Sequence, residues 1–213
     1  LSDYAAIKNG SYGKLMKAYY AKQDAEKLSG KGDTSQKLTL MKTSADSLKK
    51  SADALNDSSL WEKKKIKKKD EKTGEEIEVE DYDWDKITKA VKSFVEDYND
   101  VVKEAGESNT KDVLRNASWM TGMTDKNSNM LAKIGITIGK GNKLELDEDA
   151  LKQADISSLK TVFTGYNSFV SKISQKATGI SNAANRASAT YTNNGTYSKT
   201  DSLLTSSKID EEV

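Results

Sequence analysis

Apolar residues recur along the chain at alternating steps of three and four, which is the spacing of one face of an α-helix. The clearest case is the segment DWDKITKAVKSFVEDYNDVVKEA, at residues 83–105. One stripe holds its apolar positions: Trp84, Ile87, Val91, Phe94, Tyr98, Val101 and Ala105. We therefore predict a central core helix here, with Asp83 or Asp85 near its start and Gly106 after its end.

Two further helices are predicted on the amino-terminal side. Residues 12–29 carry a broad face of Leu, Met, Tyr and Ala, which the glycine-rich residues 30–33 end. Residues 34–56 carry a narrower heptad seam: Leu38, Met41, Ala45, Leu48, Ala52 and Leu55. The simplest interpretation is an antiparallel pair of helices joined by a tight turn. The alternative is that the seam is a coiled coil that binds a partner or a second copy.

The period changes at about residues 60–82, where a cluster of six lysines precedes a cluster of four glutamates. A turn signal at residues 72–74 separates the clusters, so we predict a projecting β-hairpin. A nucleic-acid patch is the weaker interpretation, because the acids cancel the field that a phosphate meets. The expected register pairs Ile66 with Ile77. It places Lys63 opposite Glu80, Lys65 opposite Glu78, and Lys67 opposite Glu76.

The second half of the chain begins with a shorter predicted helix over residues 109–123. Its core face holds Val113, Leu114, Ala117, Trp119 and Met120. One or two helical turns follow at residues 127–133. Alternating apolar residues on both sides of a turn at 139–142 then predict a small hairpin at about residues 134–146. After it, Asp147 is expected to cap a short helix with the sequence EDALKQA.

The last predicted element is one long helix over residues 158–189. Its seam holds large residues, including Tyr166, in the first half and mainly alanines in the second. This narrowing predicts a bundle at one end and a thin coiled-coil arm, shared with another subunit, at the other. The arm supplies a candidate partner interface: Ile173, Ala177, Ile180, Ala184 and Ala187.

Together these elements predict a mainly α protein, an elongated antiparallel helical bundle with two small β-hairpins. The bundle domain is expected to span residues 1–189, and residues 190–213 are expected to form a polar, flexible tail. Hydrophobic residues make up 35% of the chain and charged residues 31%, which fits apolar stripes on helices better than a thick globule. The net charge of +1 gives no overall attraction to nucleic acid or anionic lipid. No apolar run reaches the roughly 18 residues of a membrane-spanning helix.

The chemistry open to the chain is narrow, because it has no cysteine and no histidine. Disulfides, thiolate metal sites and Ser-His-carboxylate catalysis are therefore excluded. Asp125, Asn127 and Asn129 resemble the start of a calcium loop, but Met130 and Ile136 stand where glycine and glutamate are needed. Residues 135–141 have the wrong spacing for a phosphate-binding loop. We expect no enzyme, metal or cofactor, although carboxylates alone leave a two-carboxylate hydrolase open.

Two segments together resemble a known family: VKSFVEDYNDVV at residues 91–102 and LAKIGITIGKGNKLELDEDALKQA at residues 131–154. Their ordered residues resemble the carboxyl-terminal part of the bacterial flagellar filament-cap (hook-associated) protein family. The matching positions are Phe94, Val95, Tyr98, Asn99, Gly135, Ile136, Thr137, Lys143, Leu144, Leu146, Asp147, Leu151 and Ala154. Members of that family carry large β-rich domains between their helical halves. This chain has only the hairpin of residues 60–82 there, as a reduced relative would.

The resemblance implies a non-enzymatic structural or assembly protein of the flagellar axial type. Its implied partners are like subunits, flagellin or other flagellar components, bound through helix–helix association, with no nucleic acid and no membrane insertion. It implies export from the cytoplasm to the extracellular flagellum. We expect the alanine-rich arm to stay loose in the monomer and to pack on assembly, which permits a homo-oligomer. The alternative is a helical adaptor or secretion-chaperone module that uses the seam of residues 38–55 or the charged hairpin.

Overall fold

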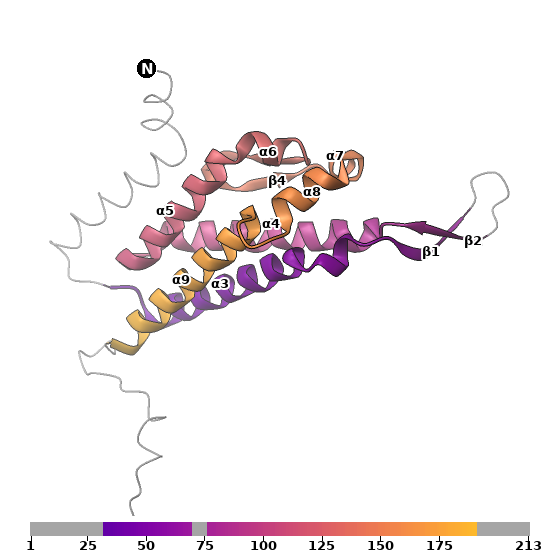
Figure 1. Cartoon of the computed structure of the whole chain (residues 1–213). Helices are drawn as coiled ribbons and strands as arrows, with labels where there is room; N and C mark the ends of the chain where they lie inside the picture. The colour runs from indigo at the N-terminus through magenta and orange to yellow at the C-terminus, as the bar shows by residue number, and fades with distance from the viewer. Residues whose placement is uncertain (1–31, 70–75, 191–213) are drawn as a thin grey trace, which may run out of the picture.

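The computed structural model describes residues 32–69 and 76–190 of the chain. Its main bundle contains α3 (Ser35–Asn56), α4 (Trp84–Glu107), α5 (Lys111–Lys126) and α9 (Phe169–Thr190) (Figure 1). Helix α3 packs on α4 and α9, and α5 packs on the same two helices. The four helices therefore enclose one core, and the mainly α prediction is confirmed. The helix predicted over residues 12–29 and the tail beyond residue 190 lie outside the described residues.

Helix α4 is the predicted central helix. Ile87, Val91, Phe94, Tyr98 and the rest of its stripe are fully buried, whereas Trp84 at its start is partly buried. The Asp83 side chain caps the helix by accepting a hydrogen bond from the backbone N–H of Lys86 at 3.0 Å. The helix continues through Gly106 and ends at Glu107, so the prediction that Gly106 follows its end is wrong. It stops where Ser108 turns to extended backbone.

Helix α3 confirms the second predicted helix and its seam. Thr34 caps it by accepting from the Lys37 N–H at 3.2 Å. All six seam residues are buried, from Leu38 to Leu55. Because α4 and α9 both pack on α3, the seam is filled by helices of the same chain.

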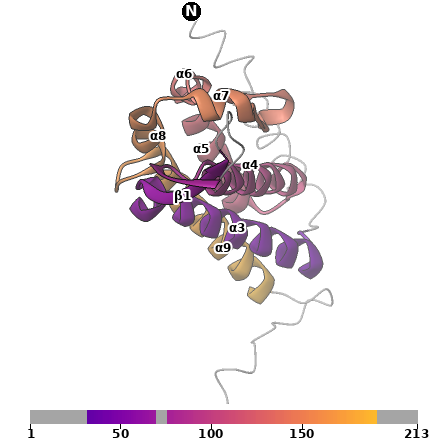
Figure 2. The same ribbon diagram turned by 90° about the vertical axis from the view of Figure 1, so that its right-hand side faces the viewer.

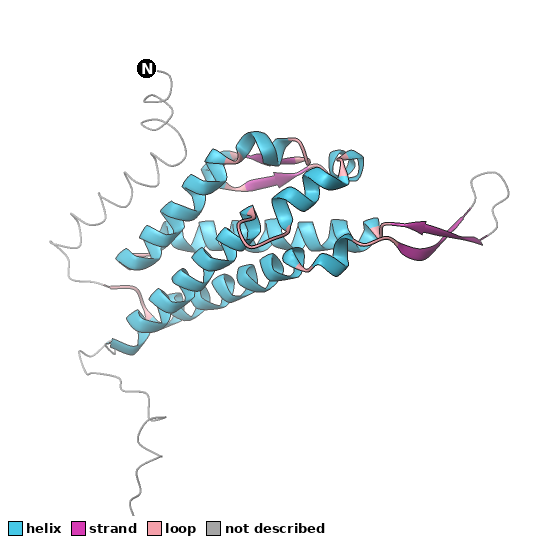
Figure 3. Cartoon of the chain, viewed as in Figure 1, coloured by secondary structure: helices cyan, strands magenta, loops and turns pink. Residues whose placement is uncertain are grey.

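A second layer covers one side of α4 (Figure 3). It consists of α6 (Ser128–Ala132), β3 (Ile136–Ile138), η2 (Lys140–Asn142), β4 (Leu144–Leu146), α7 (Glu148–Gln153) and α8 (Ile156–Phe163). Strands β3 and β4 pair antiparallel, with Ile136 opposite Leu146. Ile136 and Leu144 are buried and belong to the core that α4 forms. The predicted small hairpin and the helix after it are therefore present.

The single long helix predicted over residues 158–189 is wrong. The chain forms α8 and α9 with a break between them, where Thr164 is extended and Gly165 has φ +98°. Tyr166, expected in the seam, lies in this break and is 83% exposed. The break lets Phe163 stack on Trp61 at 5.4 Å between ring centroids, while Phe169 packs edge-on against Phe94 at 6.2 Å. These two aromatic contacts stabilise the chain on either side of the break in the helix.

The first predicted hairpin consists of β1 (Lys64–Lys69) and β2 (Glu76–Asp81), and it follows a short helix, η1 (Ser58–Trp61). It extends beyond the end of the bundle where α3 ends and α4 begins (Figure 1), and Figure 2 looks onto that end.

The register of this hairpin differs from the prediction by two residues, because Ile66 lies opposite Val79 and not Ile77. A shift of two keeps every side chain on its predicted face. The observed register places Lys64 opposite Asp81, whereas the predicted one would have placed Asp81 opposite Glu62. Opposite charges across strands stabilise a sheet and like charges destabilise it. The Lys63 ammonium also lies 5.7 Å from the Tyr82 ring at the base of the ribbon.

Candidate interaction surfaces

The five residues predicted as a partner interface lie on the inner face of α9. Ile173, Ala177, Ile180 and Ala184 are fully buried, and Ala187 is partly buried against the same core. Helix α9 packs along α3 and α5, so this end of the helix is not a loose arm in the folded chain. The cause is the matching seam of α3, which offers small and medium side chains along its length. A role for these five residues in binding a partner stays a prediction.

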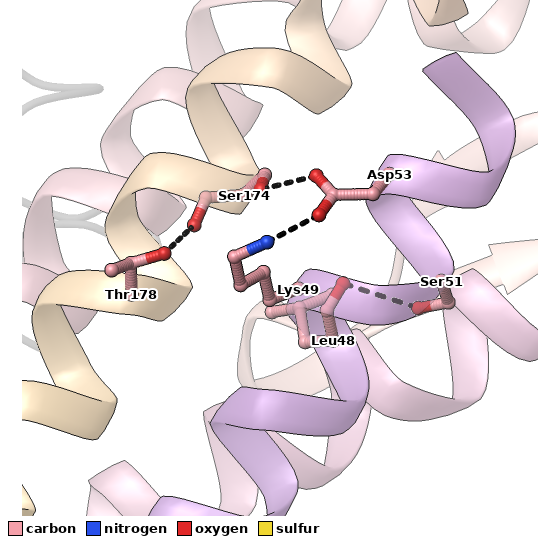
Figure 4. Close-up of polar contacts among 6 residues, drawn as sticks. All are labelled: Leu48, Lys49, Ser51, Asp53, Ser174 and Thr178. Atoms are coloured by element: carbon pink, nitrogen blue, oxygen red, sulfur yellow. Dashed lines mark hydrogen bonds and ion pairs between the residues drawn. The ribbon is translucent and has the colours of Figure 1, made fainter. Parts of the chain in front are cut away.

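Two polar rungs, seven residues apart on both helices, join α9 to α3. One consists of Lys49, Asp53 and Ser174, and the other of Lys42, Asp46 and Ser181. In the first rung, shown in Figure 4, the Ser174 hydroxyl donates to Asp53 at 2.7 Å while Lys49 pairs with the other carboxylate oxygen. In the second, the Ser181 hydroxyl donates to Asp46 at 2.6 Å. The repeat fixes the antiparallel register of the two helices.

Electrostatics keeps the two rung carboxylates charged. Burial raises the pKa of Asp46 and Asp53, but hydrogen bonds from a lysine and a serine, together with the nearby lysine charge, outweigh it. Each pKa therefore lies below its ordinary value. Both lysine–aspartate pairs are about half exposed, so each adds modestly to stability and serves mainly to set the register.

Two residues of the α4 motif hold neighbouring elements in place. The Asn99 amide donates to the Leu144 carbonyl at 2.9 Å and accepts from the Leu144 N–H at 2.7 Å, as a neighbouring strand would. The buried Tyr98 hydroxyl donates to Thr124 Oγ1 at 2.9 Å, and burial raises the pKa of Tyr98. The motif therefore attaches α4 to β4 and to α5.

Gly135 of the second motif occupies a position that requires glycine. Its φ is +79°, and a Cβ there would lie 2.6 Å from the Asp147 carbonyl oxygen and 2.9 Å from the Leu151 nitrogen. Asp147 in turn donates its N–H to the Gly135 carbonyl at 2.8 Å and caps α7 with its side chain. This residue pair brings the two ends of the small hairpin together. The motif residues that the sequence singled out are thus structural.

Asp33 joins the start of α3 to the corner between α4 and α5. Its carboxylate accepts from the Ser108 hydroxyl at 2.6 Å, the Thr110 hydroxyl at 2.7 Å, and the Asn109 and Thr110 N–H groups at 2.9 Å. Burial raises the pKa of Asp33, but these hydrogen bonds outweigh it, so the pKa lies below its ordinary value. Sequence reasoning missed this contact, because no local pattern joins residues more than 70 positions apart.

A shallow groove of about 380 Å³ lies between α3 and α4. Its lining is mostly small, including Ser47, Ser51 and Ala90, and the exposed lysines Lys50, Lys86 and Lys89 lie around it. Asp97 is the acid in the groove. Burial raises its pKa, and repulsion from the neighbouring carboxylates Asp100 and Glu96 adds to the shift. The groove therefore has a floor of small side chains and a border that is mainly basic.

Trp119, predicted in the core face of its helix, is 61% exposed. It lies off the stripe that buries Val113, Ala117 and Met120, and this displacement explains the error. The Lys176 ammonium of α9 lies 5.4 Å from the centre of its ring. Trp119 is thus a surface aromatic that lies over the α5–α9 contact.

Within residues 32–69 and 76–190, no group of three or more Asp or Glu side chains is arranged to hold a metal ion. In the same part of the chain, none of the helices is both long and apolar enough to cross a membrane.

A comparison with protein families finds one similarity, in the second half of the chain. Residues 108–211 match a family described as the flagellar hook-associated protein 2 C-terminus. This region, just under half of the chain, is similar to that family. No curated protein and no solved structure matches the chain.

The matched region begins at Ser108, just after α4, and includes α5 to α9. The second motif, with Gly135 and Asp147, lies inside it, whereas the α4 motif with Tyr98 and Asn99 lies before it. The α4 motif nevertheless contacts that region, through the hydrogen bonds to Leu144 and Thr124. The family region and the preceding helices therefore share one core.

Proposed function

We propose that this chain is a non-enzymatic structural or assembly protein of the bacterial flagellum, similar to the filament cap. The observation that carries the proposal is the match of residues 108–211 to the hook-associated protein 2 C-terminus. Its proposed partners are like subunits, flagellin or other flagellar components. Its proposed location is the extracellular flagellum, reached by export from the cytoplasm.

The folded chain supports binding through surfaces rather than chemistry on a small substrate. The groove between α3 and α4 is shallow and lined mostly by small side chains. Apolar side chains of the bundle, including Ile180, fill the core. Association through helices therefore uses outer faces such as the groove between α3 and α4, or requires α9 to separate from α3.

The proposal is tested by locating the protein in the bacterium that encodes it. Flagella are sheared from cells, and the chain is detected with antibody by immunoblot and by gold labelling in the electron microscope. We expect the protein in the sheared fraction, with gold on the filament. A strain lacking the gene controls for antibody specificity. Recovery of the protein only in the cell-body fraction would contradict the proposal.

A second candidate, a helical adaptor or secretion-chaperone module, is favoured by the same groove. The small side chains on its floor allow close approach of another helix, and its basic border suits a helix with acidic flanks. Charge reversal of Lys50, Lys86 and Lys89 at the border of the groove separates the candidates. Loss of partner capture with unchanged binding to flagellin favours the adaptor, whereas loss of flagellin binding favours the structural role.

A further inference from the structure

The hairpin of β1 and β2 is a ribbon whose two edges carry opposite charge. Strand β1 reads KKIKKK, with lysine at every position except Ile66. Strand β2 reads EIEVED, with acids at all positions except Ile77 and Val79. Each of the two strands pairs only with the other in the part of the chain that the structure describes. The unpaired N–H and C=O groups on the outer edge of a strand can pair with another strand. The open edge of β1 is basic and the open edge of β2 is acidic.

The two faces of the ribbon also differ. On one face, Lys65 lies opposite Glu80 and Lys67 opposite Glu78. Lys67 also forms a diagonal ion pair with Glu76 at 3.7 Å, with both side chains more than 60% exposed. On the other face Ile66 lies opposite Val79, between the pairs Lys64–Asp81 and Lys68–Ile77, and Ile77 is 40% exposed. Because side chains alternate with a period of two, a second ribbon laid alongside continues both patterns at once.

We infer that the β2 edge of one copy pairs antiparallel with the β1 edge of a second copy. This inference rests on the proposed assembly with like subunits and names the surface that it uses. At such a junction the glutamates of β2 face the lysines of β1, and the apolar row of Ile77 and Val79 meets Ile66. The occupant of each edge is therefore the opposite edge of another copy of this chain.

Charge selects this pairing over the alternatives. Two β1 edges would bring lysines opposite lysines, and two β2 edges would bring acids opposite acids, both of which destabilise a sheet. Unlike edges form a head-to-tail contact, in which every copy keeps one edge open for the next. Such contacts produce a ring or an open chain of subunits, not a closed dimer.

The bundles attached to the ribbons can be accommodated in such an assembly. Antiparallel continuation points every ribbon the same way, so all bundles lie at the same end of the shared sheet. Strands in a sheet rotate by about 20–25° from one to the next, so each copy of two strands turns its bundle by roughly 40–50°. This rotation swings neighbouring bundles apart instead of stacking them at the spacing of the strands.

A charge-exchanged hairpin tests the inference without disrupting the ribbon itself. The exchanged variant carries K65E, K67E and K69E in β1 with E76K, E78K and E80K in β2. Every directly opposed pair within the chain keeps opposite charges, because Lys65, Lys67 and Lys69 lie opposite Glu80, Glu78 and Glu76. The net charge is unchanged. The control is K92E with E148K, which exchanges an exposed ion pair, 3.3 Å long, between α4 and α7 of the bundle.

The measurement is capture between affinity-tagged and untagged full chains at low salt, with light scattering for oligomer size. We expect wild type to retain wild type, and the exchanged variant to retain itself, at least tenfold better than either retains the other. The control variant is expected to mix freely with wild type, and raising the salt to about 0.5 M is expected to weaken every capture.

Free mixing of wild type with the exchanged variant would overturn the hairpin inference, although the flagellar proposal would stand on the location of the protein. Monomers at every concentration would overturn it as well. Because the chain has no cysteine, single variants K67C and E78C give a second reading. In an equimolar mixture, a disulfide heterodimer well above its share in the 1:2:1 ratio of random pairing supports the unlike-edge contact, and a heterodimer at or below that share contradicts it.

Discussion

Gly135 and Asp33 show how single residues determine the path of this chain. Gly135 has a left-handed backbone with no room for a Cβ. The Asp33 carboxylate accepts hydrogen bonds from the backbone N–H groups at the corner between α4 and α5. Neither residue belongs to an apolar stripe. Both act on backbone groups, which must be hydrogen-bonded or solvated wherever the chain turns.

Substituting Gly135 by alanine is expected to lower the free energy of unfolding by about 2–5 kcal/mol, since it adds backbone strain and a clash with two backbone atoms. Gly141 is the matched control, because its φ is +71° but its Cβ would meet open space. G141A is expected to cost about 1 kcal/mol. Urea unfolding followed by circular dichroism measures both, and equal costs would contradict the explanation.

Substituting Asp33 by asparagine is expected to lower the unfolding free energy at pH 7 by about 1–2 kcal/mol. The pKa of Asp33 is lower in the folded chain, so its contribution is complete above the unfolded pKa of about 3.9 and disappears as pH falls through the folded pKa. The difference between wild type and D33N should therefore shrink from about pH 4 downward.

Urea unfolding at several pH values between 7 and 2 measures that difference. D125N, at an exposed position of α5, is the control and is expected to change the unfolding free energy little. A difference between wild type and D33N that stays constant with pH would exclude a role for the charge of Asp33.

Sequence reasoning at this scale succeeds where a residue acts on near neighbours. The caps at Asp83 and Asp147 were predictable, because a side chain and the helix it caps lie within three residues. The contacts of Asp33 and Asn99 were not, since each depends on a tertiary approach. Trp119 was misplaced because a helix position beside a buried one can still face solvent.

At the scale of elements, the contact between α3 and α9 combines an apolar seam with repeated polar rungs. The seam follows from the period of apolar residues, which is why both helices were predictable. The rungs are built from serines and aspartates on the solvent side of the seam, and such residues carry no helical signal. The break at Gly165 was missed because Phe163, Tyr166 and Phe169 follow one another at steps of three, which continues the helical spacing across it.

The rung of Asp53 and Ser174 is expected to show a coupling energy of about 0.5–1.5 kcal/mol in a double-mutant cycle of D53A and S174A. Because its hydrogen bond joins two helices, removing either partner should cost nearly as much as removing both. K49A is the control, since its ion pair lies within α3, and should cost only about 0.3–0.5 kcal/mol. Additive costs for D53A and S174A would show that the rung does not join the helices.

At the scale of the whole molecule, the hairpin lies outside the core of the bundle, as the sequence predicted. Charge clustering and the change of period indicated a ribbon outside the core. The exact register depended on Asp81 and Tyr82 at its base, which the pairing of isoleucines did not take into account. The family region, by contrast, shares its core with the helices that precede it.

Replacing residues 64–81 by a short Gly-Ser linker is expected to change the unfolding free energy of the bundle by less than about 1 kcal/mol. The strands contribute no residue to the buried core, and shortening a connection lowers its closure entropy only slightly. Thermal unfolding followed by circular dichroism measures this in both variants. W61A is the comparison, because it removes a buried indole that donates to Leu55 at 2.8 Å, and should cost about 3–5 kcal/mol.

The described chain enters at Gly32 and leaves at Thr190 on the end of the bundle opposite the ribbon (Figure 1). Two short connections, residues 62–63 and 82–83, join the ribbon to the bundle, so any tilt between the two parts would be largest in effect at the far end of the bundle. A helix of 24 residues such as α4 is about 36 Å long. A tilt of about 10° at these connections would carry the opposite end through roughly 6 Å. Fluorescent labels near Gly32 and on the ribbon would convert a small angular change into a measurable displacement.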